Sequence, residues 1–493
     1  MGGGSGWMYV LPMHSDPRPS DPAVRHVVVV GGGISGLSAA ERLAAAGAHV
    51  TLVESAARLG GIVRTERVDG YMIEHGPDVM LATKPGTRSL AERVGIADRL
   101  VGTAARGGFV SLGGRLKRLP QGLSGLVPSR VLPIATSGLL SPIGLLRLAT
   151  EPLRKSRAHL PDESVASFMS RRLGREMYER VCEPLLTGIF SGFGTRLSME
   201  ATFPQLRAME REHGSLLAGM RARRRTAPAA AGSPFLTFPG GLQELVDAVE
   251  RTLERAPNAT IRRATPVRAV GPAEEGDHGA VVELASGETL RCDAVVVATP
   301  APVAGRLLAD SDPALAAELA SIELGSTATV SLAYAADEVP HPLDGTGYVV
   351  PRTEGRPAQA CTWVSSKHAG RAPAGTRLFR VFIGGAQRPE LVTRPDADLV
   401  AIAREELRRT LGVTAAPKLE LVSRWVGAMP QYHMGHPERV RRIEARVAAT
   451  PWLALAGNSY RGVGVPDCIA SGERAAARAL SGDVPSAAAS PST

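Results

Sequence analysis

Fully apolar runs alternate with helix-type segments along much of this chain. Val27–Val30 is apolar at every position, which is typical of a parallel strand that helices cover on both faces. The next segment carries apolar residues at helical spacing and ends at Gly47, and a second apolar run closes at Glu54. This order of strand, helix and strand predicts a Rossmann-like α/β domain.

Other parts of the chain show different patterns. Residues 235–255 predict a strand, a Gly–Gly turn and a helix, and Ala294–Ala298 is a further buried strand. Residues 302–418 contain strands with alternating polar and apolar positions, so we expect a mixed sheet that forms one wall of a substrate cavity. Residues 109–225 have mostly helical spacing. The Rossmann-like domain is therefore predicted to be assembled from separated pieces of sequence.

These patterns predict three kinds of structured segment between two flexible tails. The tails are residues 1–23 and 482–493, which are rich in small and polar residues. The structured segments are dinucleotide-binding (24–84, 226–310 and 418–481), substrate-binding (85–109 and 311–417) and helical (110–225).

Length and composition agree with a multidomain globular protein. The chain has 493 residues, more than one hydrophobic core normally contains. No apolar run reaches the roughly 18 residues of a membrane-spanning helix. Its four cysteines are scattered singly, which argues against a disulfide framework and against a zinc site. The first residues lack the features of a signal peptide, so we expect a cytoplasmic protein without a metal.

The positive charge of the chain is concentrated in its middle. Between Val110 and Arg225 there are 19 Lys or Arg and 9 Asp or Glu, and this surplus exceeds the net charge of +9 for the whole chain. Apolar residues lie among these cations near Arg147, Arg154 and Lys155. This combination predicts either contact with an anionic membrane surface or helices that cover the active site with a basic outer face. No aromatic residues are interleaved with the cations, so nucleic-acid binding is not expected.

The first strand–helix turn predicts a dinucleotide site. Gly31, Gly33 and Gly36 have G-x-G-x-x-G spacing, which allows a tight turn, close approach of a pyrophosphate and close packing of helix on strand. The helix N-terminus supplies free N–H groups and a positive dipole end for the phosphates. Glu54 follows 23 residues after Gly31, where its carboxylate can accept hydrogen bonds from ribose hydroxyls.

A second pair of glycines favours FAD over NAD. Arg58, Gly60, Gly61 and Thr65 form an R-x-G-G-x-x-x-T pattern directly after the acid. This pattern resembles the continuation found in the FAD-dependent amine oxidase and protoporphyrinogen oxidase superfamily. The strand that follows ends in a turn that should bring Gly76–Val79 near the cofactor.

Motifs along nearly the whole chain sharpen this resemblance. Besides "GGGISGLSAAERL" and "RLGGIVRTE", the chain contains "EPLLTGIFSG", "TFPGGLQELV", "MPQYHMGH" and "GNSYRGVGVPDCIASG". Together they resemble the oxygen-dependent protoporphyrinogen/coproporphyrinogen III oxidase family of haem biosynthesis. The resemblance implies a Rossmann-like FAD-binding domain, a mixed-sheet substrate domain and a helical, membrane-associating domain. It also implies oxidation of coproporphyrinogen III or protoporphyrinogen IX by O₂, with release of hydrogen peroxide.

The resemblance places the cofactor residues at both ends of the chain. Some would hold the ADP half, others would lie beside the flavin, and Val463–Val465 in the late glycine turn would cover the flavin ring. The implied FAD-binding residues are Gly31, Gly32, Gly33, Ile34, Ser35, Gly36, Glu54, Ser55, Arg58, Gly61, Ile62, Gly76, Pro77, Asp78, Val79, Val267, Trp425, Gly457, Val463, Gly464 and Val465.

The substrate residues implied by the family are fewer. Phe382 and Val349 match residues of the family's cavity, Gly188 matches a glycine that leaves room for the macrocycle, and Arg106 is a candidate for a propionate group. The eukaryotic members carry an arginine where this chain has Gly108. That departure favours the bacterial subgroup, several of whose members take the more acidic coproporphyrinogen.

No motif in the chain demands a catalytic side chain. The expected chemistry is hydride transfer from a bridging carbon to flavin N5, so the protein supplies position and electrostatics. His433 and His436 are three residues apart in a probable loop, where structural roles are expected. The alternatives are another flavin amine oxidase, a carotenoid desaturase-like enzyme, or a non-catalytic FAD-binding scaffold. The expected partners are the porphyrinogen, O₂ and, at the inner face, an anionic membrane, with a homodimer as an open alternative.

Overall fold

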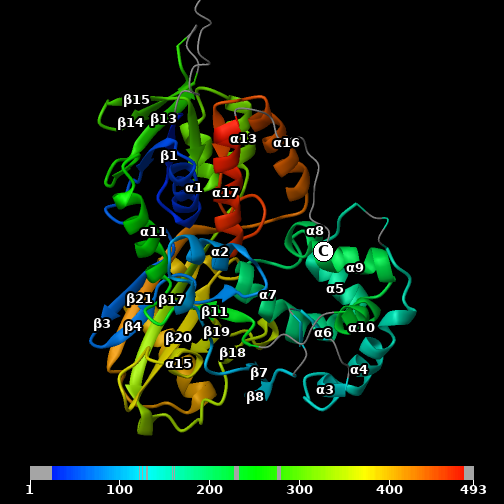
Figure 1. The fold of residues 1–493 in the computed structure, drawn as a ribbon. Helices are drawn as coiled ribbons and strands as arrows, with labels where there is room; N and C mark the ends of the chain where they lie inside the picture. The colour runs from blue at the N-terminus through cyan, green and yellow to red at the C-terminus, as the bar shows by residue number, and fades with distance from the viewer. Residues whose placement is uncertain are drawn as a thin grey trace, which may run out of the picture.

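The computed structural model describes residues 25–120, 123–124, 126–128, 132–157, 159, 161–226, 232–274 and 279–481. Both predicted tails lie outside these residues. Figure 1 shows a parallel sheet with its helices at the top, a second sheet below it, and a helical segment to one side. The predicted fold class is confirmed, because a Rossmann-like sheet, a mixed sheet and a helical segment are all present.

The Rossmann-like sheet has five parallel strands in the order β12-β2-β1-β16-β22. Its strands come from both ends and from the middle of the chain, as the separated apolar runs predict. Their bounds are β1 His26–Val30, β2 His49–Val53, β12 Ala259–Arg262, β16 Ala294–Val297 and β22 Leu453–Leu455.

Helices cover both faces of this sheet, which explains why β1 is apolar throughout. Val27 and Val29 pack into one hydrophobic core, and Val28 and Val30 pack into another on the opposite face. The first core lies under α1 Ile34–Ala45, α2 Gly86–Arg93, α11 Gln243–Arg255 and α17 Val465–Ser481. The second includes α12 Ala301–Leu307, α13 Pro313–Ala320, α16 His436–Ala448 and the antiparallel strands β13 Val267–Pro272, β14 Ala280–Leu284 and β15 Thr289–Cys292.

The second sheet has seven strands in the order β21-β17-β20-β19-β18-β7-β8. It is mixed, as predicted, because β18 and β7 are parallel and the other pairs are antiparallel. Helix α15 (Asp396–Leu411) packs against one face. The strands are β7 Phe109–Leu112, β8 Arg115–Arg118, β17 Leu324–Ala335, β18 Gly347–Val349, β19 Ala358–Trp363, β20 Thr376–Gly384 and β21 Leu419–Pro430.

The pairing in this sheet shifts two of the expected segment boundaries. β21 lies within 418–481, which we assigned to dinucleotide binding, but it pairs with β17 at the sheet edge. β7 and β8 likewise join the sheet, although most of their residues lie in the segment expected to be helical. Whether a strand joins this sheet depends on pairing partners from distant parts of the chain, and the local sequence pattern does not contain that information.

The helical segment has a hydrophobic core of its own. Ser164 caps α5 by accepting a hydrogen bond from the Ser167 backbone N–H. A π-helical turn, Tyr178–Cys182, joins α6 to α7. The helices are α3 Leu132–Ala135, α4 Pro142–Ala149, α5 Val165–Leu173, α6 Arg175–Met177, α7 Glu183–Phe190, α8 Met199–Thr202, α9 Pro204–His213 and α10 Leu216–Thr226, with β9 Leu123–Ser124 and β10 Val127–Pro128.

Short elements complete the described structure. β3 (Thr65–Val68) and β4 (Tyr71–Glu74) form a hairpin that leads into the predicted cofactor segment Gly76–Val79. The remaining strands and helix are β5 Met80–Leu81, β6 Val101–Gly102, β11 Phe235–Thr237 and α14 Val364–Lys367. The short turns are η1 Ala97–Arg99, η2 Glu151–Leu153, η4 Ala336–Glu338, η5 Arg352–Glu354 and η6 Pro389–Thr393. Among the helices of the described residues, none is long and apolar enough to span a membrane.

Candidate functional site

The first glycine turn joins β1 to α1 and leaves no room for a side chain at Gly31, Gly32 or Gly36. Gly31 has φ +105°, a left-handed conformation that favours glycine. A Cβ on Gly36 would lie 1.9 Å from the Gly31 carbonyl oxygen, so helix and turn pack backbone against backbone. Gly33 precedes α1, whose N-terminus has no capping side chain and no acidic residue in its first turn. Its backbone N–H groups are therefore available to an anionic ligand.

Glu54 closes this turn at the carboxyl end of β2. Its Oε2 accepts a hydrogen bond from the Gly32 N–H at 2.6 Å, and its Oε1 accepts from the Ala56 N–H at 2.8 Å and from Ser55 Oγ at 3.1 Å. These bonds fix the carboxylate beside the glycine turn. The Thr265 N–H donates to the Glu54 carbonyl at 2.8 Å, which brings the strand beginning at Val267 to the same edge.

The second glycine pair contacts the first turn directly. Gly33 and Gly60 form a parallel bridge, and a Cβ on Gly61 would lie 3.2 Å from the Gly33 Cα. Arg58 donates hydrogen bonds to the carbonyls of Gly61 at 2.5 Å, Leu59 at 3.0 Å and Val63 at 3.3 Å. The Arg58 guanidinium therefore stabilises the loop. These carbonyl contacts are the hydrogen bonds that the structure shows for Arg58, which is among the predicted cofactor residues.

The segment predicted beside the flavin follows the hairpin. A Cβ on Gly76 would lie 1.8 Å from the Ile62 carbonyl oxygen, so the two predicted contact points touch. Gly76, Pro77, Asp78 and Val79 are all partly exposed, whereas Tyr71–His75 and Met80 are buried. This stretch forms an accessible strip beside the glycine loops.

The late glycine turn lies beside the first one. A Cβ on Gly472 of α17 would lie 2.1 Å from the Ser35 carbonyl of α1, and Ser38 Oγ donates to the Ile469 carbonyl at 3.1 Å. The two helices pack side by side (Figure 1). The Gly464 N–H donates to Asp467 Oδ2 at 3.2 Å.

The predicted members of the late turn occupy the space between two domains. Gly457 has φ +137°, and its N–H donates to Ser471 Oγ at 3.1 Å. Val463 packs against the core of the helical segment and remains partly exposed, as does Gly464, while Val465 is buried at the start of α17. Lys84 forms an ion pair with Asp467 in the first turn of α17.

One face of the seven-stranded sheet carries the predicted substrate residues. Strand pairing places Val349, Ala360 and Phe382 in one row across β18, β19 and β20. All three are partly exposed, whereas their neighbours on the opposite face are buried against α15. The row continues through Thr329 of β17 to Ser423 of β21. An accessible apolar surface therefore adjoins buried polar groups on the same face.

Trp425 and His75 connect this face to the cofactor segment. Trp425 Nε1 donates to the His75 carbonyl at 2.6 Å, and His75 Nδ1 lies 2.8 Å from Ser423 Oγ. The pKa of His75 is lowered by burial, with the Arg64 charge adding to the effect. A neutral imidazole is therefore held against the sheet, directly before Gly76.

The structure separates the four predicted substrate residues. Val349 and Phe382 share the row described above. Gly188 is exposed on α7, where an added Cβ would meet no atom within 4 Å. Arg106 is exposed in the loop before β7, and no described contact joins it to the other three.

The residues present fit a flavin dinucleotide. The uncapped start of α1 suits its phosphates, and the fixed carboxylate of Glu54 suits its ribose. Thr329 Oγ1, Thr299 Oγ1 and the Tyr460 hydroxyl are buried without a partner among the described residues. Buried polar atoms are rarely left unpaired in native proteins, and of these three the Thr299 hydroxyl lies beside the Gly31 turn and the Thr329 hydroxyl lies in the row with Phe382, where a polar ligand could pair with them.

The histidines of "QYHMGH" have structural surroundings, as expected. His436 stacks on Tyr432 with ring centroids 4.2 Å apart, and its Nε2 lies 2.9 Å from the Tyr460 carbonyl. Burial lowers the pKa of His436 to about 4, so the ring is neutral at physiological pH. His433 lies 3.4 Å from Glu323 at the surface.

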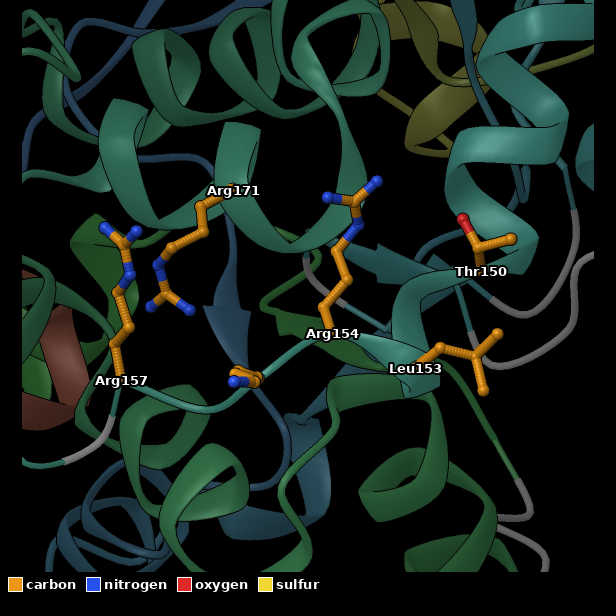
Figure 2. Close-up of a pocket in the computed structure, with 6 residues that line it drawn as sticks. Thr150, Leu153, Arg154, Arg157 and Arg171 are labelled. Atoms are coloured by element: carbon orange, nitrogen blue, oxygen red, sulfur yellow. The ribbon is translucent and has the colours of Figure 1, made fainter.

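Two surface hollows lie away from this site. One, of about 340 Å³, is at the amino ends of the parallel strands and includes His26, His49 and Asn258. The other, of about 450 Å³, is in the helical segment (Figure 2). Neither contains a residue predicted to bind cofactor or substrate, so concavity alone would have pointed to the wrong places.

Sequence reasoning missed Lys367, His368 and Arg380, which lie around the predicted residue Asp78 or beside Phe382. Asp78 is within 2.7 Å of Lys367 Nζ and 3.1 Å of His368 Nε2, and Arg380 is buried two residues before Phe382. The available signal was a single arginine inside the otherwise apolar run "LFRVFI". A charge in a buried strand requires a partner, which could have marked this position for attention.

Comparisons with known proteins agree with this geometry. The family model described as "Flavin containing amine oxidoreductase" matches residues 34–480. The chain is 34% identical to a coproporphyrinogen III oxidase of Bacillus subtilis (92% of this chain, 98% of that protein) and 36% identical to one of Propionibacterium freudenreichii (94% and 92%). A crystal structure titled as a putative protoporphyrinogen oxidase from Exiguobacterium superposes with a TM-score of 0.80 at 32% identity, covering 92% and 98% of the two chains.

Proposed function

We propose that this chain, which belongs to the flavin containing amine oxidoreductase family, is an FAD-dependent oxidase that converts a porphyrinogen to the aromatic porphyrin in haem biosynthesis. The observation that carries the proposal is similarity over nearly the whole chain to relatives named coproporphyrinogen III oxidase. The site geometry supports it, since a dinucleotide cradle adjoins an accessible apolar row.

The residues of the chain have distinct parts in this reaction. Bound FAD supplies the hydride acceptor. The paired glycine turns and Glu54 would hold its ADP half, and Gly76–Val79 with Val463–Val465 would enclose its flavin. Phe382 and Val349 would offer a flat apolar surface to the tetrapyrrole. Holding the reacting carbon in place is a matter of orientation, which can contribute about 7–11 kcal/mol to lowering a barrier.

We propose molecular oxygen as the electron acceptor, with hydrogen peroxide as the second product. The test is aerobic turnover by the purified protein. We expect a yellow protein that consumes oxygen with coproporphyrinogen III and produces red porphyrin fluorescence, with protoporphyrinogen IX assayed in parallel. A colourless protein after gentle purification would contradict FAD binding. Turnover of an amine, with neither porphyrinogen oxidised, would assign the chain to another branch of the family.

We also propose that the helical segment makes peripheral contact with an anionic membrane. Four large apolar side chains there are more than 60% exposed, namely Leu132 (74%), Ile143 (81%), Leu146 (66%) and Leu153 (85%). Beside Leu153, the exposed Arg154, Lys155 and Arg157 line the hollow of Figure 2 together with Arg171. Exposed apolar side chains next to cations match the headgroup region of an anionic bilayer.

Vesicle sedimentation tests this contact. We expect the protein to pellet with vesicles that contain phosphatidylglycerol, to remain in solution with phosphatidylcholine alone, and to be released by salt. Leu153→Ser should weaken pelleting, whereas Arg175→Ser, at an exposed site elsewhere in the segment, should not. Equal behaviour of both vesicle types would leave the alternative role, a cover over the active site.

A further inference from the structure

Arg380 is a buried cation without a carboxylate partner. Four arginines of the described chain are buried, and three of them have a carboxylate oxygen within 4 Å. These three are Arg172, Arg207 and Arg371. Arg380, 7% exposed, forms no ion pair with any described residue, and its Nε has no hydrogen-bond partner there. Burying a charge without a counter-charge is unfavourable, so this guanidinium lacks an anion.

The carboxylates nearest to Arg380 are already used. Asp78 accepts from Lys367 Nζ at 2.7 Å and faces His368 Nε2 at 3.1 Å. Glu74 is paired with Arg371 at 3.0 Å. Both carboxylates are close enough to oppose the lowering of the Arg380 pKa by burial, but neither forms a direct pair with it. The missing anion must therefore come from outside the described chain.

Arg380 lies at the junction of the two predicted binding surfaces. Its Nη2 donates to the His75 carbonyl at 3.0 Å, the same oxygen that accepts from Trp425. Its Cζ lies 4.8 Å from the centre of the Phe382 ring. Arg380 and Phe382 are two residues apart on β20, so they project from the same face of the sheet. The guanidinium is therefore held in place beside both the cofactor segment and the substrate row.

We infer that Arg380 binds a carboxylate of the substrate deep in the site and thereby favours coproporphyrinogen over protoporphyrinogen. This inference rests on the proposed function. Coproporphyrinogen III carries a propionate on every pyrrole ring, so one carboxylate can point inward while others remain near solvent. Protoporphyrinogen IX carries propionates along one edge only and vinyl groups along the other. With its propionates near solvent, it places a vinyl group against Arg380 and leaves the buried charge uncompensated.

An arginine suits this role better than a lysine. Its planar guanidinium can pair with a carboxylate through two parallel N–H bonds, and it remains charged at every accessible pH. The reduced flavin is a second source of negative charge near this place. The two sources have different consequences: a carboxylate partner affects porphyrin binding, and a flavin partner affects the reduction potential.

The experiment uses the FAD-loaded protein with Arg380→Met, Arg380→Gln and Arg380→Lys. Arg377→Met is the matched control, since Arg377 is on the same strand but is partly exposed, and its Nη1 donates to the carbonyl of the adjacent Thr376. Equilibrium binding of coproporphyrin III and of its tetramethyl ester is followed by flavin and porphyrin absorbance. The ester has the same ring without the acidic groups.

We expect Arg380→Met and Arg380→Gln to weaken coproporphyrin III binding by about ten- to hundredfold, the usual effect of losing a hydrogen bond between charged groups. Ester binding should be unchanged, Arg380→Lys should recover part of the loss, and Arg377→Met should match the parent. The KM for coproporphyrinogen III should rise in the neutral variants while that for protoporphyrinogen IX stays constant. FAD content and the flavin reduction potential should not change.

Equal losses for the acid and the ester would overturn the inference, because they would indicate a packing role. So would an altered flavin potential with unchanged coproporphyrin binding, which would assign the charge to the cofactor. If Arg380→Met does not fold, Arg380→Lys still decides, since unchanged binding and unchanged KM ratios contradict bidentate pairing. Failure of the parent protein to oxidise either porphyrinogen would overturn the proposed function instead, and is therefore a distinct result.

Discussion

Buried arginines occur both in the helical segment and in the seven-stranded sheet, with opposite surroundings. In the helical segment, Arg172 and Glu151 are both fully buried and paired, and Glu151 also accepts from the Leu216 and Leu217 N–H groups at 3.0 and 3.2 Å. On the sheet, Arg380 has a carbonyl and an aromatic ring but no carboxylate. The first arrangement is complete within the chain, whereas the second is completed by a ligand.

An orphan Nε alone does not distinguish the two regions. Arg172 also leaves its Nε without a hydrogen-bond partner among the described residues, although its charge is met by two glutamates. Net charge in the immediate surroundings is therefore the informative property. A buried residue can satisfy every packing criterion and still indicate a binding site through its uncompensated charge.

The largest effect should come from breaking the complete arrangement. Glu151→Gln removes the nearer of two buried carboxylates from Arg172 and leaves Glu210 Oε1 at 3.5 Å, so we expect the free energy of unfolding to fall by about 3 kcal/mol, the lower end of the range for breaking a buried pair. Denaturant unfolding measures this change. Glu179→Gln, which breaks the surface pair with Arg175, serves as the control and should leave the midpoint unchanged. A small effect of Glu151→Gln would mean that the paired charges contribute little, and the comparison would fail.

Arg172 is buried with a counter-charge and Arg380 without one. His436 is a third case, because it is buried as a neutral group. Its pKa is about 4 when folded and 6.5 ordinarily, so below pH 6.5 the unfolded chain binds a proton that the folded chain does not. Stability should therefore decrease as the pH falls from 6.5 to 4, by up to about 3 kcal/mol. The free energy of unfolding of His436→Gln should vary less with pH across this range than that of the parent protein. An identical pH dependence in that variant would contradict this account.

Ligand binding should stabilise the incomplete region specifically. Coproporphyrin III at a hundred times its dissociation constant should raise the unfolding free energy of the parent by about 2.7 kcal/mol. Arg380→Met should show a smaller increase at the same porphyrin concentration, and thermal scans can follow both. Stabilisation of equal size in the two proteins would show that the porphyrin does not use this guanidinium.

The smallest effect should be on the free protein. Arg380→Met removes an unpaired buried charge and keeps most of the side-chain volume, so its stability without porphyrin should stay within about 1 kcal/mol of the parent. Denaturant unfolding of the FAD-loaded, porphyrin-free proteins gives the value. A loss as large as that of Glu151→Gln would remove the distinction between the two regions.

Local sequence patterns were sufficient for the dinucleotide half of the molecule. The spacing of Gly31, Gly33 and Gly36 and the position of Glu54 follow from one contiguous strand–helix–strand unit, whose physics is local. The parallel strand β16 could likewise be found from its uninterrupted apolar run. The approach of the late turn to the first one came from family resemblance, because the sequence itself carries no sign that Gly472 packs on Ser35.

The charged part of the site could not be predicted in the same way. Arg380, Asp78, His75 and Trp425 come from three separate strands and loops, up to 350 residues apart in the hydrogen-bonded pairs. These residues lie close together because β20 and β21 pair with β17 in one particular register. The sequence pattern of the three strands is compatible with other registers, so it does not predict this contact. The family resemblance therefore named Asp78 and Trp425, whereas sequence reasoning named none of Lys367, His368 and Arg380, which meet them only in the folded chain.

The packing of α17 on α1 has a consequence for biosynthesis. The strand β22 and helix α17 come from Leu453–Ser481, whereas the first glycine turn is made within the first tenth of the chain. At about 5–20 residues per second, that turn waits roughly 20–90 seconds on the ribosome for its partner. During that time the first glycine turn lacks the helix that packs against α1. If the late turn encloses the flavin as proposed, we expect a chain cut short before α17 to remain without cofactor, so that cofactor loading reports that translation has passed this helix.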